Sequence, residues 1–97
     1  MSSFVISFRS PLNNRPDATE EAEWGKWFGE IGSHVADSGH RVSRVSALGS
    51  RTDLVDALAG YIVVDAADFD AALEIARGCP GLRHGRAVEV GETVPTS

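Results

Sequence analysis

The sequence predicts an α+β domain with the chain order strand, helix, strand, strand, helix, strand. Four short runs of apolar and β-branched residues have the composition of strands, and two amphipathic stretches have helical spacing. Segments rich in glycine, proline and asparagine separate these runs. A length of 97 residues predicts a single domain over residues 1–97, and the polar ends 1–3 and 92–97 are expected to be loose.

The first strand is expected over residues 4–9, where aromatic and β-branched residues are frequent. Alternation places Phe4, Ile6 and Phe8 on one face and Val5, Ser7 and Arg9 on the other. The turn-forming residues 10–17 that follow predict an exposed loop.

The first helix is expected to begin at Thr19, whose side chain can cap the first amides. Gly39 is expected to end it in a left-handed turn. One apolar stripe has helical spacing and consists of Trp24, Trp27, Phe28, Ile31 and Val35. Three glycines at positions 25, 29 and 32 lie off this stripe and lower the intrinsic helix propensity.

Residues 40–48 are expected to form the second strand, with a bulge, and residues 49–57 a connection. Within that connection, residues 52–56 have the composition of a short turn. Residues 60–66 carry the strongest strand pattern, and their nearly continuous apolar run is typical of a central strand.

The second helix is expected over residues 69–77, with Asp68 as its N-cap. Residues 78–81 should stop it, because proline cannot continue the hydrogen-bond ladder. The last strand is expected over residues 87–90, with Val88 and Val90 on one face.

This order is that of a ferredoxin-like fold, in which a four-stranded antiparallel sheet carries two helices on one face. The opposite face is then expected to be free of helices and to mix apolar with polar groups. Its expected members are Val5, Ser7, Arg9, Tyr61, Val63, Asp65, Ala87 and Glu89. A second copy of the chain can cover such a face, and a small ligand can bind in the cleft between the copies.

Composition argues against several classes of partner. The net charge of −5 and a single lysine, Lys26, disfavour nucleic acid and anionic membrane surfaces. No apolar run is long enough for a membrane span, and the first residues do not have the pattern of a signal peptide. The lone Cys79 fits a reducing compartment, so a cytoplasmic location is expected.

The candidates for chemistry are three histidines, two carboxylates and one thiol. His34 is expected on the flank of the first-helix stripe, partly buried, and His40 at a strand edge, while His84 lies in a loop. None has a metal-type spacing partner, so neither a metal nor another cofactor is expected.

The acidic residues Asp65 and Glu89 suit an acid–base pair if the fold brings them together. The simpler interpretation pairs each with Arg9, Arg44 or Arg86. Cys79 is expected to be a buried packing residue, because a helix C-terminus raises a thiol pKa.

Residues 60–80, followed by Gly85-Arg86-Ala87-Val88-Glu89-Val90, resemble the YCII-related family, which includes the DGPF-domain proteins. The resemblance implies a dimeric α/β barrel made of two ferredoxin-like units. It also implies, for some members, a His–Asp pair whose histidine lies in the first helix. Here the DGPF segment is absent, residues 48–59 take its place, and Trp24 and Trp27 stand near the position of that histidine.

The leading functional hypothesis is a homodimer that binds a small molecule on the helix-free sheet face. The expected contacts are Ser7, Arg9, Tyr61, Asp65, His84 and Glu89. One alternative is an enzyme for a small organic substrate, with His34 or His84 as general base and Asp65 or Glu89 as the orienting carboxylate. Another is an interaction module whose helix-free face serves assembly alone.

Overall fold

A computed structural model of the protein describes residues 2–11, 14–51 and 56–95. The main elements follow the predicted order and are β1 (Ser2–Pro11), α1 (Ala18–Ile31), β2 (Val35–Arg41), β3 (Asp56–Ala66), α2 (Phe69–Arg77) and β4 (Ala87–Glu92). Three short 3-10 helices in the described residues are η1 (Gly32–His34), η2 (Gly49–Arg51) and η3 (Pro80–Arg83).

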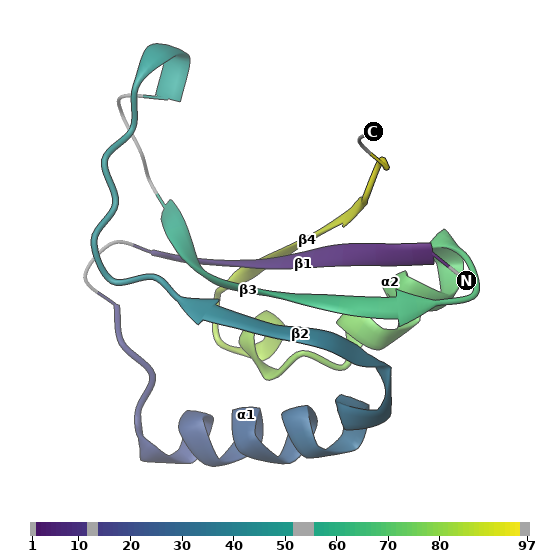
Figure 1. Ribbon diagram of the computed structural model, residues 1–97. Helices are drawn as coiled ribbons and strands as arrows, with labels where there is room; N and C mark the ends of the chain where they lie inside the picture. The colour runs from purple at the N-terminus through teal and green to yellow at the C-terminus, as the bar shows by residue number, and fades with distance from the viewer. Residues whose placement is uncertain (1, 12–13, 52–55, 96–97) are drawn as a thin grey trace.

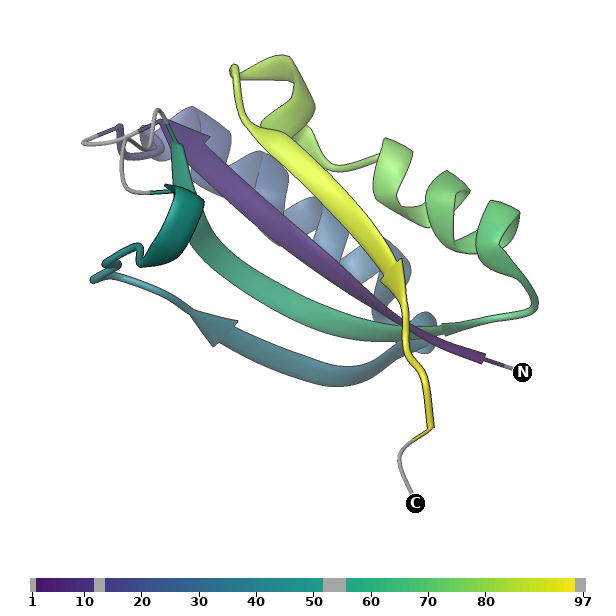
Figure 2. The same ribbon diagram turned by 90° about the horizontal axis from the view of Figure 1, so that it is seen from above.

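The strands form one antiparallel sheet in the order β2-β3-β1-β4. Both helices cover the same face of this sheet and leave the other face free (Figure 1, Figure 2). This arrangement confirms the predicted α+β, ferredoxin-like architecture.

The core lies between the sheet and the helices, and strand alternation determines which residues enter it. Phe4, Ile6 and Phe8 of β1 are buried, as are Ile62 and Val64 of β3. The helices contribute Trp27, Ile31, Ala72 and Ala76, with Val88 and Val90 of β4 packed against the cluster. The predicted division of the strands into two faces is therefore confirmed.

Helix α1 begins and ends earlier than expected. Its N-cap is Asp17, whose Oδ1 accepts a hydrogen bond from the amide of Glu20 at 2.8 Å, and Thr19 lies inside the helix. The helix ends at Ile31, with Gly32 as the C-cap, and not at Gly39. Glycines at 29 and 32 weaken the last turns, so pairing with the sheet determines the conformation beyond that point.

Strand β2 therefore occupies residues 35–41, whereas residues 42–48, expected to be strand, are irregular. Val35, expected on the helical stripe, pairs with Val64 and packs against the core. Gly39 does adopt a positive φ of 64°, but inside β2, next to a register shift. A Cβ at Gly39 would lie 1.8 Å from the carbonyl oxygen of Tyr61, so only glycine fits there.

The ordered strands are longer than predicted at several ends. Ser2 and Ser3 belong to β1 and Glu92 to β4, and the Thr93 amide donates to the Ser3 carbonyl at 3.0 Å. Strand β3 begins at Asp56, four residues before the predicted start at position 60. Most of the turn expected at 52–56 lies outside the described residues.

Helix α2 matches its prediction at both ends. Asp68 is the N-cap, and its Oδ1 accepts a hydrogen bond from the amide of Ala71 at 2.8 Å. Within the part of the chain that the structure describes, neither helix is long and apolar enough to cross a membrane.

Two extensions rise on the helix-free side of the sheet. Residues 42–51 leave the end of β2 and carry η2, and the chain after β4 turns to the same side (Figure 1, Figure 2). Leu48 on the first extension is 90% exposed, and Val94 on the second is 79% exposed. Both apolar side chains are therefore open to solvent in a single copy of the chain.

Candidate functional site

A row of polar side chains crosses the helix-free face, with one member from each strand of the sheet. Ser7 of β1 lies opposite Tyr61 of β3 on one side and opposite Glu89 of β4 on the other. His40 of β2 lies opposite Tyr61. Directly opposed residues in antiparallel strands share a face, so His40, Tyr61, Ser7 and Glu89 form one line. We call this line the cross-strand row.

Two side-chain contacts made by members of the row join neighbouring strands. The His40 Nδ1 lies 3.1 Å from the hydroxyl oxygen of Tyr61. The Arg9 Nε donates to Glu89 Oε1 at 2.8 Å, an ion pair that the sequence had suggested for Glu89. The Arg9 side chain is 23% exposed and that of Glu89 is 60% exposed, so the carboxylate is open to a ligand.

The local geometry of β2 brings His40 to this row. Asp37 Oδ1 accepts a hydrogen bond from the Gly39 amide at 2.8 Å, which holds the irregular turn of the strand. The positive φ of Gly39 then restores pairing at His40 and Arg41. Histidine at position 40 was expected only at a strand edge, because this bulge has no clear signature in the sequence.

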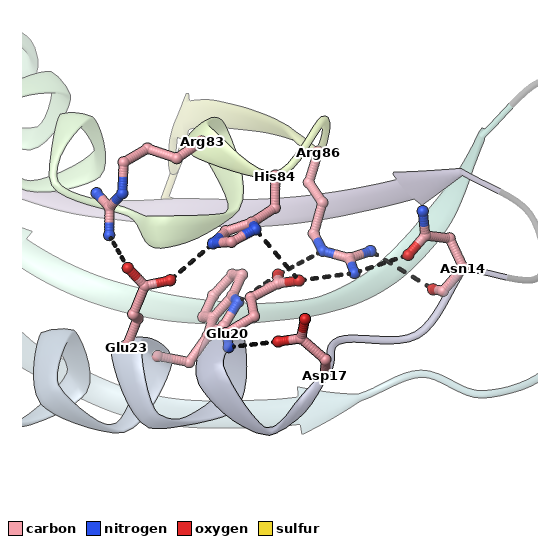
Figure 3. A network of polar contacts seen from close by, with 8 residues as sticks. Asn14, Asp17, Glu20, Glu23, Arg83, His84 and Arg86 are labelled. Carbon is pink, nitrogen blue, oxygen red and sulfur yellow. Dashed lines mark hydrogen bonds and ion pairs between the residues drawn. The ribbon is translucent and has the colours of Figure 1, made fainter.

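A second polar cluster lies on the helix side and joins α1 to the chain between η3 and β4 (Figure 3). Arg86 and Glu20 form a buried ion pair, with Nε to Oε2 at 2.6 Å and Nη2 to Oε1 at 3.1 Å. Their side chains are 3% and 4% exposed, respectively. Trp24 Nε1 also donates to Glu20 Oε2, and Arg86 reaches the Asn14 side chain.

His84 extends this cluster toward the surface. Its Nε2 lies 2.7 Å from Glu23 Oε1, and its Nδ1 lies 4.0 Å from Glu20 Oε1. Arg83 Nη2 donates to the other oxygen of Glu23 at 3.0 Å. His84 is thus beside two carboxylates, although they are Glu23 and Glu20 and not Asp65 or Glu89.

The positive groups lower the pKa of both glutamates. Hydrogen bonding from Arg86 is the main reason that the pKa of Glu20 lies below its usual 4.5, and it outweighs the opposing effect of burial. Hydrogen bonds from His84 and then Arg83 lower the pKa of Glu23. Both carboxylates are therefore held in the charged form.

Cys79 has no chemical role in either cluster. It is fully buried, and burial raises the pKa of its thiol to about 11. A thiol of this kind is protonated near neutral pH and is a poor nucleophile. The expectation of a buried packing residue is confirmed.

The structure separates the residues that the sequence grouped into one site. Ser7, Arg9, Tyr61 and Glu89 are together on the helix-free face, whereas His84 belongs to the helix-side cluster. Asp65 lies opposite Ser3, whose hydroxyl donates to it at 2.8 Å.

Ser3 and Ser7 are separated by four residues on β1, about 13 Å. Asp65 and Glu89 therefore do not form an acid–base pair. Arg86, suggested as a partner for one of them, pairs with Glu20.

His34 lies in η1, beyond the end of α1, and it is exposed. The expected partly buried place beside Trp27 and Ile31 is wrong, because the helix stops before residue 34. Among the described residues, no hydrogen bond or ion pair joins His34 to a carboxylate. The role of general base suggested for it has no geometric support.

Sequence reasoning missed Glu20 and Glu23 as candidate residues, and it did not place His40 on the helix-free face. A signal for Glu20 was present, since positions 20, 24, 27 and 31 continue one helical stripe and place Glu20 on the buried face. A buried carboxylate needs a cation, but nothing in the sequence identifies Arg86 as that cation.

Within residues 2–11, 14–51 and 56–95, no group of three histidine, cysteine or acidic side chains is arranged to hold a metal ion. No protein-family model matches the chain, and no curated protein matches it significantly.

Proposed function

We propose that the protein is a homodimer that binds a small polar molecule in a cleft on the helix-free sheet face. The cross-strand row is the observation that carries this proposal. It brings a histidine, a tyrosine, a serine and a glutamate from the separate strands into one line. A few convergent polar groups on a rigid scaffold are the usual means of orienting a small ligand.

A single open sheet face is too flat to enclose a ligand, so the proposal includes a second copy as the other wall. Val5 and Val63 lie opposite each other on this face, next to the row, and both are partly exposed. The extensions with exposed Leu48 and Val94 rise on the same side. A second copy that covers the face removes this apolar surface from water.

The ligand chemistry follows from the groups in the row. The Tyr61 hydroxyl and the His40 ring both donate and accept hydrogen bonds, as does the Ser7 hydroxyl. Glu89 adds a charged acceptor whose partner Arg9 stands beside it. These groups favour a small neutral or zwitterionic molecule with hydroxyl or amino groups. The dimeric barrel implied by the YCII-related resemblance agrees with this arrangement, and we include membership of that family in the proposal.

A second candidate function is acid–base catalysis on the helix side. It is favoured by the 2.7 Å contact between His84 Nε2 and Glu23 Oε1, in which the carboxylate orients the ring. The side chains are 32% and 34% exposed, so a substrate can approach the histidine. This candidate replaces the Asp65 and Glu89 partners with Glu23.

The oligomeric part of the proposal is tested by light scattering on the wild type, Val63→Lys and Ala22→Lys. We expect a wild-type dimer and a Val63→Lys monomer, because the substitution places an unpaired charge in the interface. Ala22 is exposed on α1, so Ala22→Lys adds the same charge elsewhere and should remain a dimer. A wild-type monomer at micromolar concentration would contradict the proposal.

The binding part is tested by a crystal structure of the dimer and by thermal-shift measurements with small sugars, polyols and nucleosides. A polar cavity beside Tyr61, and a ligand that stabilises the wild type more than Tyr61→Phe, would support binding. A dimer whose sheet faces are tightly packed, with no stabilising compound, would identify an assembly module instead.

A further inference from the structure

A pocket of about 300 Å³ lies on the helix side of the molecule, away from the cross-strand row. One wall is a single face of α1, and the other is the segment from the end of α2 through η3. Its lining residues are Glu23, Lys26, Trp27, Glu30, Gly78, Pro80 and Arg83. The volume is at the lower end of the range for ligand sites, which suits a molecule the size of an amino acid.

The indole of Trp27 provides an unused hydrogen-bond donor at this pocket. Trp27 is 4% exposed, and its Nε1 has no hydrogen-bond partner among the described residues. The neighbouring Trp24 differs, because its Nε1 donates to Glu20 at 2.9 Å. A buried N–H group without an acceptor is unfavourable, so an acceptor supplied by a ligand would stabilise it.

Gly78, which also lines the pocket, lies close to this donor. A Cβ at Gly78 would lie 3.1 Å from Trp27 Nε1 and 3.3 Å from its Cδ1. The φ of Gly78 is −78°, a value that any residue adopts. Conformational freedom therefore does not require glycine at this position, whereas the approach to the indole edge does favour it.

The charges at the pocket are of both signs and only some of them are paired. The Glu23 carboxylate is paired with His84 and Arg83 (Figure 3). Lys26 and Glu30 have no hydrogen bond or ion pair within the part of the chain that the structure describes. They are separated by one helical turn, with lysine first, which is the weaker order for mutual pairing.

We propose that this pocket binds the zwitterion of a free α-amino acid. The ligand carboxylate accepts hydrogen bonds from the Trp27 indole and Lys26, and its ammonium group donates to Glu30. A ligand that carries only a negative charge would be repelled by the carboxylates of Glu23 and Glu30. A ligand that carries only a positive charge would be repelled by Lys26 and Arg83. A molecule with both charges complements both.

The test is a titration of ¹⁵N-labelled protein with L-alanine, followed by the indole N–H signals in NMR spectra. The chain has two tryptophans, so it gives two such signals, and Trp24→Phe assigns them. We expect a saturable shift of the Trp27 signal and a much smaller change at Trp24. Propionate and ethylamine each lack one of the charges and should bind at least about tenfold more weakly.

Variants identify the groups that bind. Glu30→Gln and Lys26→Met should each weaken L-alanine binding at least about tenfold, since each removes a charge-assisted hydrogen bond. Glu21→Gln removes an equal charge from an exposed position of α1 outside the pocket and should leave binding unchanged. The spectrum of each variant reports whether it is folded.

Three results would overturn the proposal. They are the absence of a saturable shift with L-alanine, equal binding of propionate, and equal weakening by Glu21→Gln. None of them affects the proposed dimer or its ligand, because the cross-strand row lies on the other face of the sheet.

Discussion

Glu20 illustrates how the environment of one residue changes its role. An acid in the first turn of a helix ordinarily lies in solvent and interacts with the helix dipole. Here the residue belongs to the buried stripe of α1 and is 3% exposed. Its charge is tolerated because Arg86 and Trp24 donate hydrogen bonds to both carboxylate oxygens. Either charged partner alone would be buried without compensation.

We predict that Glu20→Ala and Arg86→Ala each lower the free energy of unfolding by about 3–5 kcal/mol, because each leaves an unpaired buried charge. The double variant should lose clearly less than the sum of the two single losses, since no charge is then left unpaired. Urea denaturation of the four proteins measures these differences.

The exposed pair Glu74–Arg77 on α2 provides a matched control. Its side chains are 72% and 62% exposed, so alanine substitutions there should show a coupling of only about 0.3–0.5 kcal/mol. A coupling at Glu20–Arg86 as small as this would mean that the buried pair is not formed in solution.

At this scale the sequence predicted which residues share a face but not which residues meet. Alternation placed Ser7, Arg9, Tyr61 and Glu89 together, because side chains in a strand have a period of two. The register between strands depends on long-range pairing and on the bulge at Gly39, neither of which is a local property. His40 was therefore not recognised as a member of the row.

Among the elements, those with strong local signals were predicted best. Helix α2 has an Asp N-cap, a clear apolar stripe and a Gly-Cys-Pro-Gly end, and its predicted bounds are confirmed. Helix α1 has three glycines within or next to its second half, so its local preference is weak. There the pairing of β2 with β3 outweighs helix propensity, and the chain leaves the helix at Ile31.

We predict that Gly39→Ala lowers the free energy of unfolding by more than about 2 kcal/mol, because it combines two unfavourable effects. A φ of 64° is strained for alanine, and the added Cβ would lie 1.8 Å from the Tyr61 carbonyl oxygen. Thermal or urea unfolding measures the loss, and the amide signals of β2 report whether this edge strand stays paired.

Gly49→Ala separates the two effects. Gly49 has a φ of 76°, but nothing lies within 4 Å of the Cβ position. This variant should lose only about 1–2 kcal/mol from backbone strain. Equal losses in the two variants would show that the close approach at Gly39 does not contribute.

At the scale of the whole molecule, the two halves of the chain contact each other in both layers of the fold, the sheet and the helix layer. In the sheet, β1 pairs with β3 on one side and with β4 on the other. In the helix layer, the cluster around Glu20 and Arg86 joins α1 to the segment before β4. The sequence predicted the sheet and its free face from the element order, but it did not predict the second connection, which depends on side chains 66 residues apart.

This connection should make the stability of the molecule depend on acid pH. Glu20 and Glu23 have pKa values below their usual 4.5 in the folded protein, so near that pH the unfolded chain binds more protons. Their stabilising contribution is therefore complete above pH 4.5 and is lost as the pH falls through the folded values.

We predict that the free energy of unfolding decreases over this range, and that Glu20→Gln makes the decrease shallower as well as lowering stability near neutral pH. Urea denaturation at a series of pH values measures both effects, with Glu21→Gln as the control that should keep the wild-type slope. If Glu20→Gln kept the wild-type slope, the buried pair with Arg86 could not be the source of the acid sensitivity.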